Sequence, residues 1–79
     1  MPKLPVISGQ EAARVLERAG FDRLNRKQRG KGSHLLLVRH DPTKLITIPD
    51  HRELAPGTLR AIIRQADLSV DRFVELLRG

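Results

Sequence analysis

Three histidines, His34, His40 and His51, are the side chains of this chain best suited to acid–base chemistry. An imidazole has an unperturbed pKa of about 6.5, so it can take up or release a proton near neutral pH. His34 stands out because it follows Gly32 closely and opens the most hydrophobic run in the chain, residues 34–38. Cleavage of RNA by its own 2′-hydroxyl needs a base for that hydroxyl and an acid for the departing 5′-oxygen, and this route requires no metal. We therefore expect the chemistry of this protein at His34.

Other chemistries fit the same residues less well. Three histidines without close His-x-x-x-His spacing make a poor metal site, and the chain has no cysteine to supply a thiolate. Ser33 and His34 are adjacent on a predicted strand, so their side chains point to opposite faces and cannot form a nucleophile–base pair. The stretch from Gly30 to Ser33 lacks the spacing of a phosphate-binding loop and leads into a strand. No cofactor or metal is expected.

A basic cluster directly precedes this histidine. Five of the nine residues from Arg23 to Lys31 are basic, and none of the nine is acidic. The whole chain has a net charge of +6. Such clustering indicates a polyanionic partner. The chain has no Trp or Tyr, so base stacking is not expected, and binding should depend on salt. The residues expected to contact RNA are Arg26, Lys27, Arg29, Lys31 and Gly32.

The elements that position these residues follow from local patterns. Ser8 and Glu11 form a capping box that begins a helix over residues 9–19, and Gly20 suits its left-handed C-terminal cap. Proline at position 56 begins a second helix. The remaining predicted elements are an edge strand over 21–28, a glycine turn over 29–32, a strand over 33–40, a type I hairpin loop over 41–44, a strand over 45–48, a polar loop over 50–55, a helix over 56–66 and a short last helix over 70–77.

This order, α-β-β-β-α with a terminal helical turn, predicts a two-layer α+β domain with a three-stranded antiparallel sheet and helices on one face. Alternation along the middle strand puts His34, Leu36 and Val38 on one face and Leu35 and Leu37 on the other. Since both faces have leucines, a partner protein or a second copy is a candidate cover for one of them.

The hairpin also predicts a register. If residues 41–44 form the loop and His40 pairs with Leu45, His34 lies opposite His51, and one imidazole could act as base while the other acts as acid. The alternative for His51 is a loop residue that fixes a turn, which we prefer. His40 lies at the far end of the strand and is assigned no role.

The length and composition of the chain indicate how many domains it has and where it is located. Seventy-nine residues make one domain over residues 1–79. No apolar run approaches the roughly 20 residues of a membrane span, and the first residues do not form a signal peptide. The expected location is therefore the cytoplasm.

Three stretches together resemble the HicA (YcfA-like) toxin family. They are Gly32-Ser33-His34 before an apolar strand, Ile48-Pro49-Asp50-His51, and residues 56–66, which read PGTLRAIIRQA. The resemblance covers nearly the whole chain, from the Ser8-capped helix to Leu77.

The resemblance implies a double-stranded-RNA-binding-domain-like (dsRBD-like) fold and a translation-independent mRNA interferase, an endoribonuclease inhibited by a HicB-type antitoxin. It places the catalytic histidine of the family at His34 and the preceding glycine at Gly32. The second histidine that often follows is replaced by Leu35, and the usual Gln-Ala-Gly ending of the second helix reads Gln-Ala-Asp at Asp67. Catalysis in the family is attributed to one histidine, which argues against a role for His51.

Two other hypotheses remain open. In the first, the fold binds RNA without cutting it. In the second, the chain acts only as one part of a complex, and an oligomer can form within the toxin–antitoxin complex. The reason for this hypothesis is that the leucine-rich strand has two apolar faces. An acidic antitoxin is expected to cover His34 and the basic loop and so to compete with mRNA.

Overall fold

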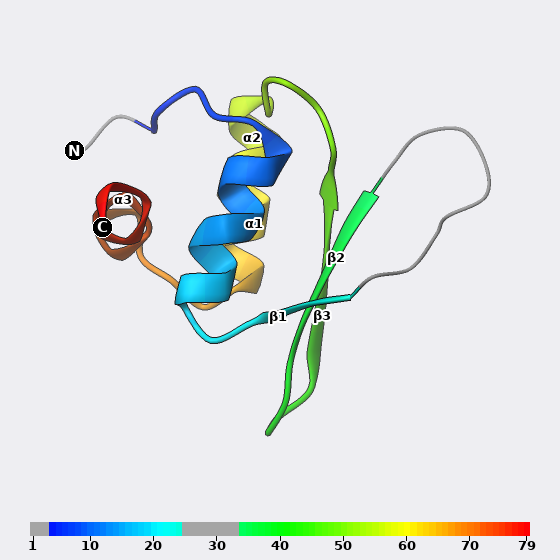
Figure 1. Ribbon diagram of the computed structural model, residues 1–79. Coiled ribbons are helices and arrows are strands. Elements are labelled where there is room, and N and C mark those ends of the chain that lie inside the picture. Colours follow the sequence, from blue (N-terminus) through cyan, green and yellow to red (C-terminus); the bar gives the residue numbers. More distant parts are fainter. Residues whose placement is uncertain (1–3, 25–33) are drawn as a thin grey trace.

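The computed structural model describes residues 4–24 and 34–79 (Figure 1). Its elements are α1 (Gly9–Arg18), β1 (Asp22–Leu24), β2 (His34–Arg39), β3 (Lys44–Pro49), α2 (Pro56–Gln65) and α3 (Val70–Arg78). The α+β class and the three-stranded antiparallel sheet are confirmed, and the order is consistent with a dsRBD-like fold. The short last helix predicted over residues 70–77 is also confirmed and extends one residue further, to Arg78.

Both ends of α1 form as the sequence predicts. The Ser8 hydroxyl accepts a hydrogen bond from the Glu11 N–H at 3.1 Å, and the Glu11 carboxylate accepts one from the Ser8 N–H at 3.2 Å. At the other end Gly20 has a φ of 102°, and the N–H of Phe21 donates to the carbonyl of Leu16. These contacts satisfy helix-end groups that would otherwise lack partners. The direction in which the chain enters the sheet is thereby fixed.

The sheet has the strand order β1-β2-β3, so β2 lies in the middle and β1 at an edge, as predicted. The predicted hairpin register is wrong. Arg39 pairs with Lys44, and the same register places His34 opposite Pro49 rather than His51. The strand β3 therefore begins one residue earlier than expected and includes Pro49.

The turn between β2 and β3 spans residues 40–43 and is not the predicted type I turn. Asp41 has a φ of 62°, whereas a type I turn needs negative φ at its central positions, and the Asp41–Pro42 peptide bond is cis. Beyond this turn, Asp67 from the connection between α2 and α3 accepts from both Arg39 (3.3 Å) and Lys44. These ion pairs hold the first pair of the ladder and favour the observed register.

The helices cover one face of the sheet (Figure 1). α1 contacts all three strands, α2 contacts β3, and α3 lies against α1. The Arg18 guanidinium donates to the carbonyls of Leu76 and Leu77 and so caps the last turn of α3. Phe73 of α3 is fully buried and belongs to the same core as the side chains of α1 and α2. None of the described helices is long and apolar enough to cross a bilayer.

The two faces of the hairpin differ sharply. Toward the helices, the fully buried side chains of Leu37, Ile46 and Ile48 belong to the hydrophobic core, and Leu35 packs against it. The opposite face, which we call the open face, consists of eight residues: Asp22, Leu24, His34, Leu36, Val38, Leu45, Thr47 and Pro49. Val38 is buried, but none of these residues belongs to the core cluster, and the helices lie on the other side of the sheet (Figure 1). The alternation predicted for β2 is therefore confirmed.

Candidate active site

His34 is the first residue of β2 and its side chain is exposed. Its Cα partner on β3 is Pro49, so the two residues share the open face. The next residue on this face is Leu36, which lies opposite Leu24 of β1. The exposed imidazole thus stands at the end of the middle strand, on the same face as the half-buried Leu24 and Leu36.

The imidazole of His34 makes no hydrogen bond or ion pair with any other residue in the described part of the chain. Among the described residues, neither ring nitrogen is therefore occupied by a partner. A neutral imidazole has one donor and one acceptor nitrogen, and a protonated one has two donors. A single exposed imidazole of this kind can accept a proton from a hydroxyl or donate one to a leaving oxygen.

The other two histidines have different surroundings. His51 is exposed, and its backbone carbonyl accepts a hydrogen bond from the Gly9 N–H at 2.9 Å. It thereby holds the start of α1 against the chain that follows β3, which matches the loop-fixing role we preferred for it. His40 lies in the β2–β3 turn at the far end of the hairpin from His34. The structure therefore does not pair His34 with a second histidine across the sheet.

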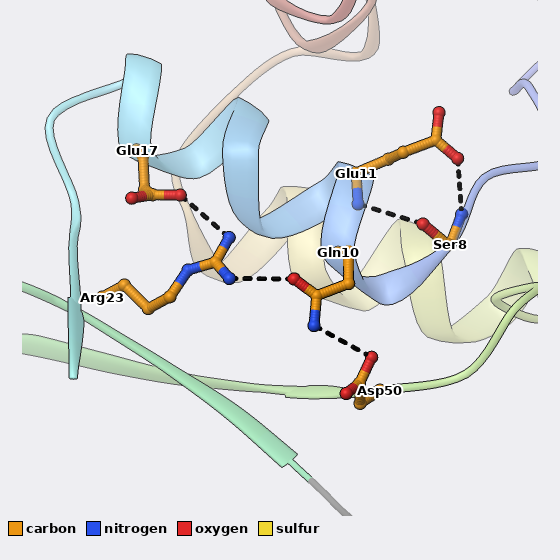
Figure 2. Close-up of polar contacts among 6 residues, drawn as sticks. All are labelled: Ser8, Gln10, Glu11, Glu17, Arg23 and Asp50. Atoms are coloured by element: carbon orange, nitrogen blue, oxygen red, sulfur yellow. Dashed lines mark hydrogen bonds and ion pairs between the residues drawn. The ribbon is translucent and has the colours of Figure 1, made fainter. Parts of the chain in front are cut away.

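A chain of polar contacts joins the two strands that flank β2 (Figure 2). The Arg23 guanidinium of β1 donates to Glu17 at 2.9 Å and to the Gln10 side-chain oxygen at 2.9 Å. The Gln10 amide then donates to the carboxylate of Asp50, directly after β3, at 3.2 Å. Helix α1 is thus tied to both edges of the sheet.

This network changes the interpretation of Arg23, which the sequence placed in the basic cluster. Its side chain is about one quarter exposed and is paired within the protein, so it is not free for a phosphate. Sequence reasoning gave neither Gln10 nor Asp50 a role in positioning the helix. They are separated by 40 positions, and no local pattern connects them.

Gly9 brings the start of α1 unusually close to the end of β3. A Cβ atom at this position would overlap the carbonyl oxygen of Pro49 and lie 3.2 Å from the Cα of Asp50. Only glycine allows this approach without a shift of the backbone. Because Pro49 is the partner of His34, this contact supports the strand end on which the histidine stands.

The residues predicted to contact RNA, Arg26, Lys27, Arg29, Lys31 and Gly32, lie outside the described residues, as does the predicted turn over 29–32. Their assignment stays a prediction. In residues 4–24 and 34–79, no group of three His, Cys, Asp or Glu side chains is arranged to hold a metal ion.

The chain matches the model of a known protein family. The family model described as HicA toxin of bacterial toxin-antitoxin matches residues 9–68, from the first residue of α1 to the connection before α3. A search of curated proteins found no match. The matched region contains the sheet, His34 and the α1 and α2 helices that cover the sheet. The chain therefore belongs to the HicA family of toxins from bacterial toxin–antitoxin systems.

Proposed function

We propose that this toxin is an endoribonuclease that cuts mRNA, independently of translation, with His34 as its single catalytic histidine. The observation that best supports the proposal is the position of His34. It is exposed, it is unpaired among the described residues, and it stands at the head of β2, where the sequence resemblance places the histidine of the family. A substrate as large as RNA can reach such a position without a deep pocket.

The proposed reaction is attack of a ribose 2′-hydroxyl on the adjacent phosphorus. The P–O bond to the 2′-oxygen forms as the P–O bond to the 5′-oxygen breaks, giving a 2′,3′-cyclic phosphate and a free 5′-hydroxyl. His34 either accepts the proton of the 2′-hydroxyl or donates a proton to the departing 5′-oxygen. Water makes the other of these two proton transfers, so the route needs no metal and no organic cofactor.

The phosphate backbone would be held by Arg26, Lys27, Arg29 and Lys31, beside Gly32. These four cations immediately precede His34 in the sequence, so RNA bound there would present its backbone near the imidazole. Each phosphate contact with a single strand contributes about 0.7 to the slope of log K against log salt. Replacement of all four by glutamine is expected to lower that slope by roughly 3 in a filter-binding titration. An unchanged slope would place the RNA elsewhere.

The partner of the toxin would be an acidic HicB-type antitoxin that covers His34 and the basic residues and so competes with mRNA for the same surface. The toxin would act as one domain in the cytoplasm, where mRNA is found, and would form an oligomer only within the toxin–antitoxin complex. A stable ternary complex of toxin, antitoxin and RNA, with full RNA affinity, would contradict this arrangement.

The reaction type is tested with purified toxin, a long single-stranded mRNA and DNA of the same sequence, all in the presence of a chelator. His34→Ala protein, purified in parallel, controls for contaminating nucleases. We expect cleavage of RNA only, by the wild-type protein only, with cyclic phosphate at the new 3′ ends. If both proteins bind RNA in a salt-sensitive way and neither cuts it, the chain is an RNA-binding module. Cleavage of DNA would exclude attack by the 2′-hydroxyl.

A further inference from the structure

A surface hollow lies between α2 and the start of α3, in the helical layer. It has a volume of about 230 Å³ and is lined by Arg60, Ile63, Arg64, Leu68 and Val70. Its floor is apolar: Ile63 is buried, and the side chains of Leu68 and Val70 are half-buried. The two arginines are exposed at its rim. The hollow thus combines an apolar base with two positive charges.

The two arginines are not neutralised within the described residues. Arg60 and Arg64 are four positions apart on one face of α2, where like charges repel, and α2 contains no acid. Asp67, the acid nearest to them in the sequence, is already bound by Lys44 and Arg39. Neither arginine makes a hydrogen bond or ion pair with another described side chain. Both guanidiniums are therefore available to an external anion.

We infer that this hollow binds an acidic amphipathic segment of a protein partner. An aliphatic side chain of the segment fills the hollow over Ile63, and flanking carboxylates accept hydrogen bonds from Arg60 and Arg64. A cavity of about 150 Å³ is enough to hold a benzene ring, so the volume suits one aliphatic side chain. Arginine is well matched to carboxylates because its planar fork can donate two parallel hydrogen bonds.

Charge and polarity together favour a protein over RNA here. A phosphate backbone would use the two arginines but would leave the apolar floor in contact with water, whereas an acidic amphipathic segment satisfies both. Asp71, in the first turn of α3, is the one acid directly beside Val70, and it makes no ion pair with either arginine. The hollow remains positive in spite of it.

This site is separate from the open face that displays His34. The helices cover the opposite face of the sheet (Figure 1), so a segment bound between α2 and α3 leaves the histidine accessible. The inference goes beyond the proposed ribonuclease function and does not depend on it. It predicts a partner that can hold the toxin without blocking His34.

The test is a titration of the full-length, methyl-labelled protein with a capped helical peptide of leucines and glutamates, followed by NMR. We expect saturable shifts of the Ile63, Leu68 and Val70 methyl groups, and affinity about tenfold weaker for the Arg60→Gln/Arg64→Gln variant. The Arg52→Gln/Arg78→Gln variant has the same net charge, but neither of its positions lines the hollow. It should bind the peptide as the wild type does.

Two further titrations exclude the alternatives. A peptide with glutamines in place of the glutamates should bind about tenfold more weakly, because it lacks the carboxylates. A single-stranded RNA should bind the Arg60→Gln/Arg64→Gln and Arg52→Gln/Arg78→Gln variants equally. The inference is overturned if the acidic peptide shifts no methyl group of the hollow, if both double variants weaken peptide binding alike, or if loss of Arg60 and Arg64 selectively weakens RNA binding.

Discussion

The two faces of the β2–β3 hairpin differ in what they contribute, although they alternate residue by residue along the same strands. Leu37 faces the helices and is fully buried, while Leu45, on the open face, is 59% exposed. His34 belongs to the open face, so its side chain is not part of the core. Single substitutions on this sheet should therefore change either the unfolding free energy or the proposed reaction of His34, depending on the face. The following predictions test that separation, from the largest expected change in stability to the smallest.

Replacement of Leu37 by alanine should cause the largest loss. Truncation of a fully buried leucine removes apolar contacts and leaves a cavity, which typically costs about 2–5 kcal/mol of unfolding free energy. Leu45→Ala is the matched control on the open face, and we expect its cost to stay within about 0.5 kcal/mol. Urea unfolding followed by circular dichroism measures both. If Leu37→Ala does not fold, Ile46→Val, which should cost about 0.5–1.5 kcal/mol, replaces it. Equal losses for the two leucines would refute the distinction between the faces.

Gly9→Ala should destabilise the protein by about 1–3 kcal/mol, because the new methyl group would overlap the backbone of Pro49. In a helix the same substitution normally helps, since alanine is the better helix former. Gly57 in α2 provides the control: a Cβ there meets nothing within 4 Å, so Gly57→Ala should stabilise by about 0.4–1 kcal/mol. Opposite signs in thermal unfolding are the expected result. Stabilisation by both would mean that α1 does not approach β3 so closely.

The smallest expected change in stability comes from Asp67, at the end of the hairpin far from His34, and it depends on pH. The hydrogen bond from Lys44, followed by that from Arg39, lowers the pKa of Asp67 below its ordinary value of 3.8. The contribution of this carboxylate to stability is therefore complete above pH 3.8 and is lost as the pH falls through the lowered pKa of the folded state. Since Asp67 is exposed, the change should be small.

Asp67→Asn isolates this contribution, because asparagine tolerates the φ of 59° at this position. The stability difference between wild type and variant should shrink as the pH falls below 3.8, measured by urea unfolding at a series of pH values. Asp22→Asn, at an exposed acid of β1 outside these ion pairs, is the control for the loss of one negative charge. A constant difference for Asp67→Asn would mean that the ion pairs do not stabilise the hairpin.

Local patterns in the sequence predicted the elements well. The capping box at Ser8 and Glu11, the positive φ at Gly20, and the alternation of His34 and Leu35 between faces all depend on residues close together in the chain. The family resemblance, read from residues 32–34, 48–51 and 56–66, is confirmed by the match over residues 9–68.

Features that depend on contacts between residues far apart in the sequence could not be predicted from local patterns. The predicted hairpin register was wrong because the turn over residues 40–43, with a positive φ at Asp41, is not the type I turn that the prediction assumed. The approach of Gly9 to Pro49 and the contacts from Arg23 through Gln10 to Asp50 arise only when α1 packs on the sheet. For the site, the sequence supplied the candidate His34, and the structure supplied its face and its neighbours.

We propose that His34, on the open face, acts in RNA cleavage and does not contribute to the stability of the fold. The most direct measurement compares mRNA cleavage rates of the wild type, His34→Ala and His40→Ala, with the unfolding free energy of each protein determined on the same samples. We predict that His34→Ala cleaves at least about 100-fold more slowly with unchanged stability, and that His40→Ala matches the wild type in both. Cleavage by His34→Ala at the wild-type rate, or a loss of cleavage that only follows a loss of folded protein, would contradict the claim.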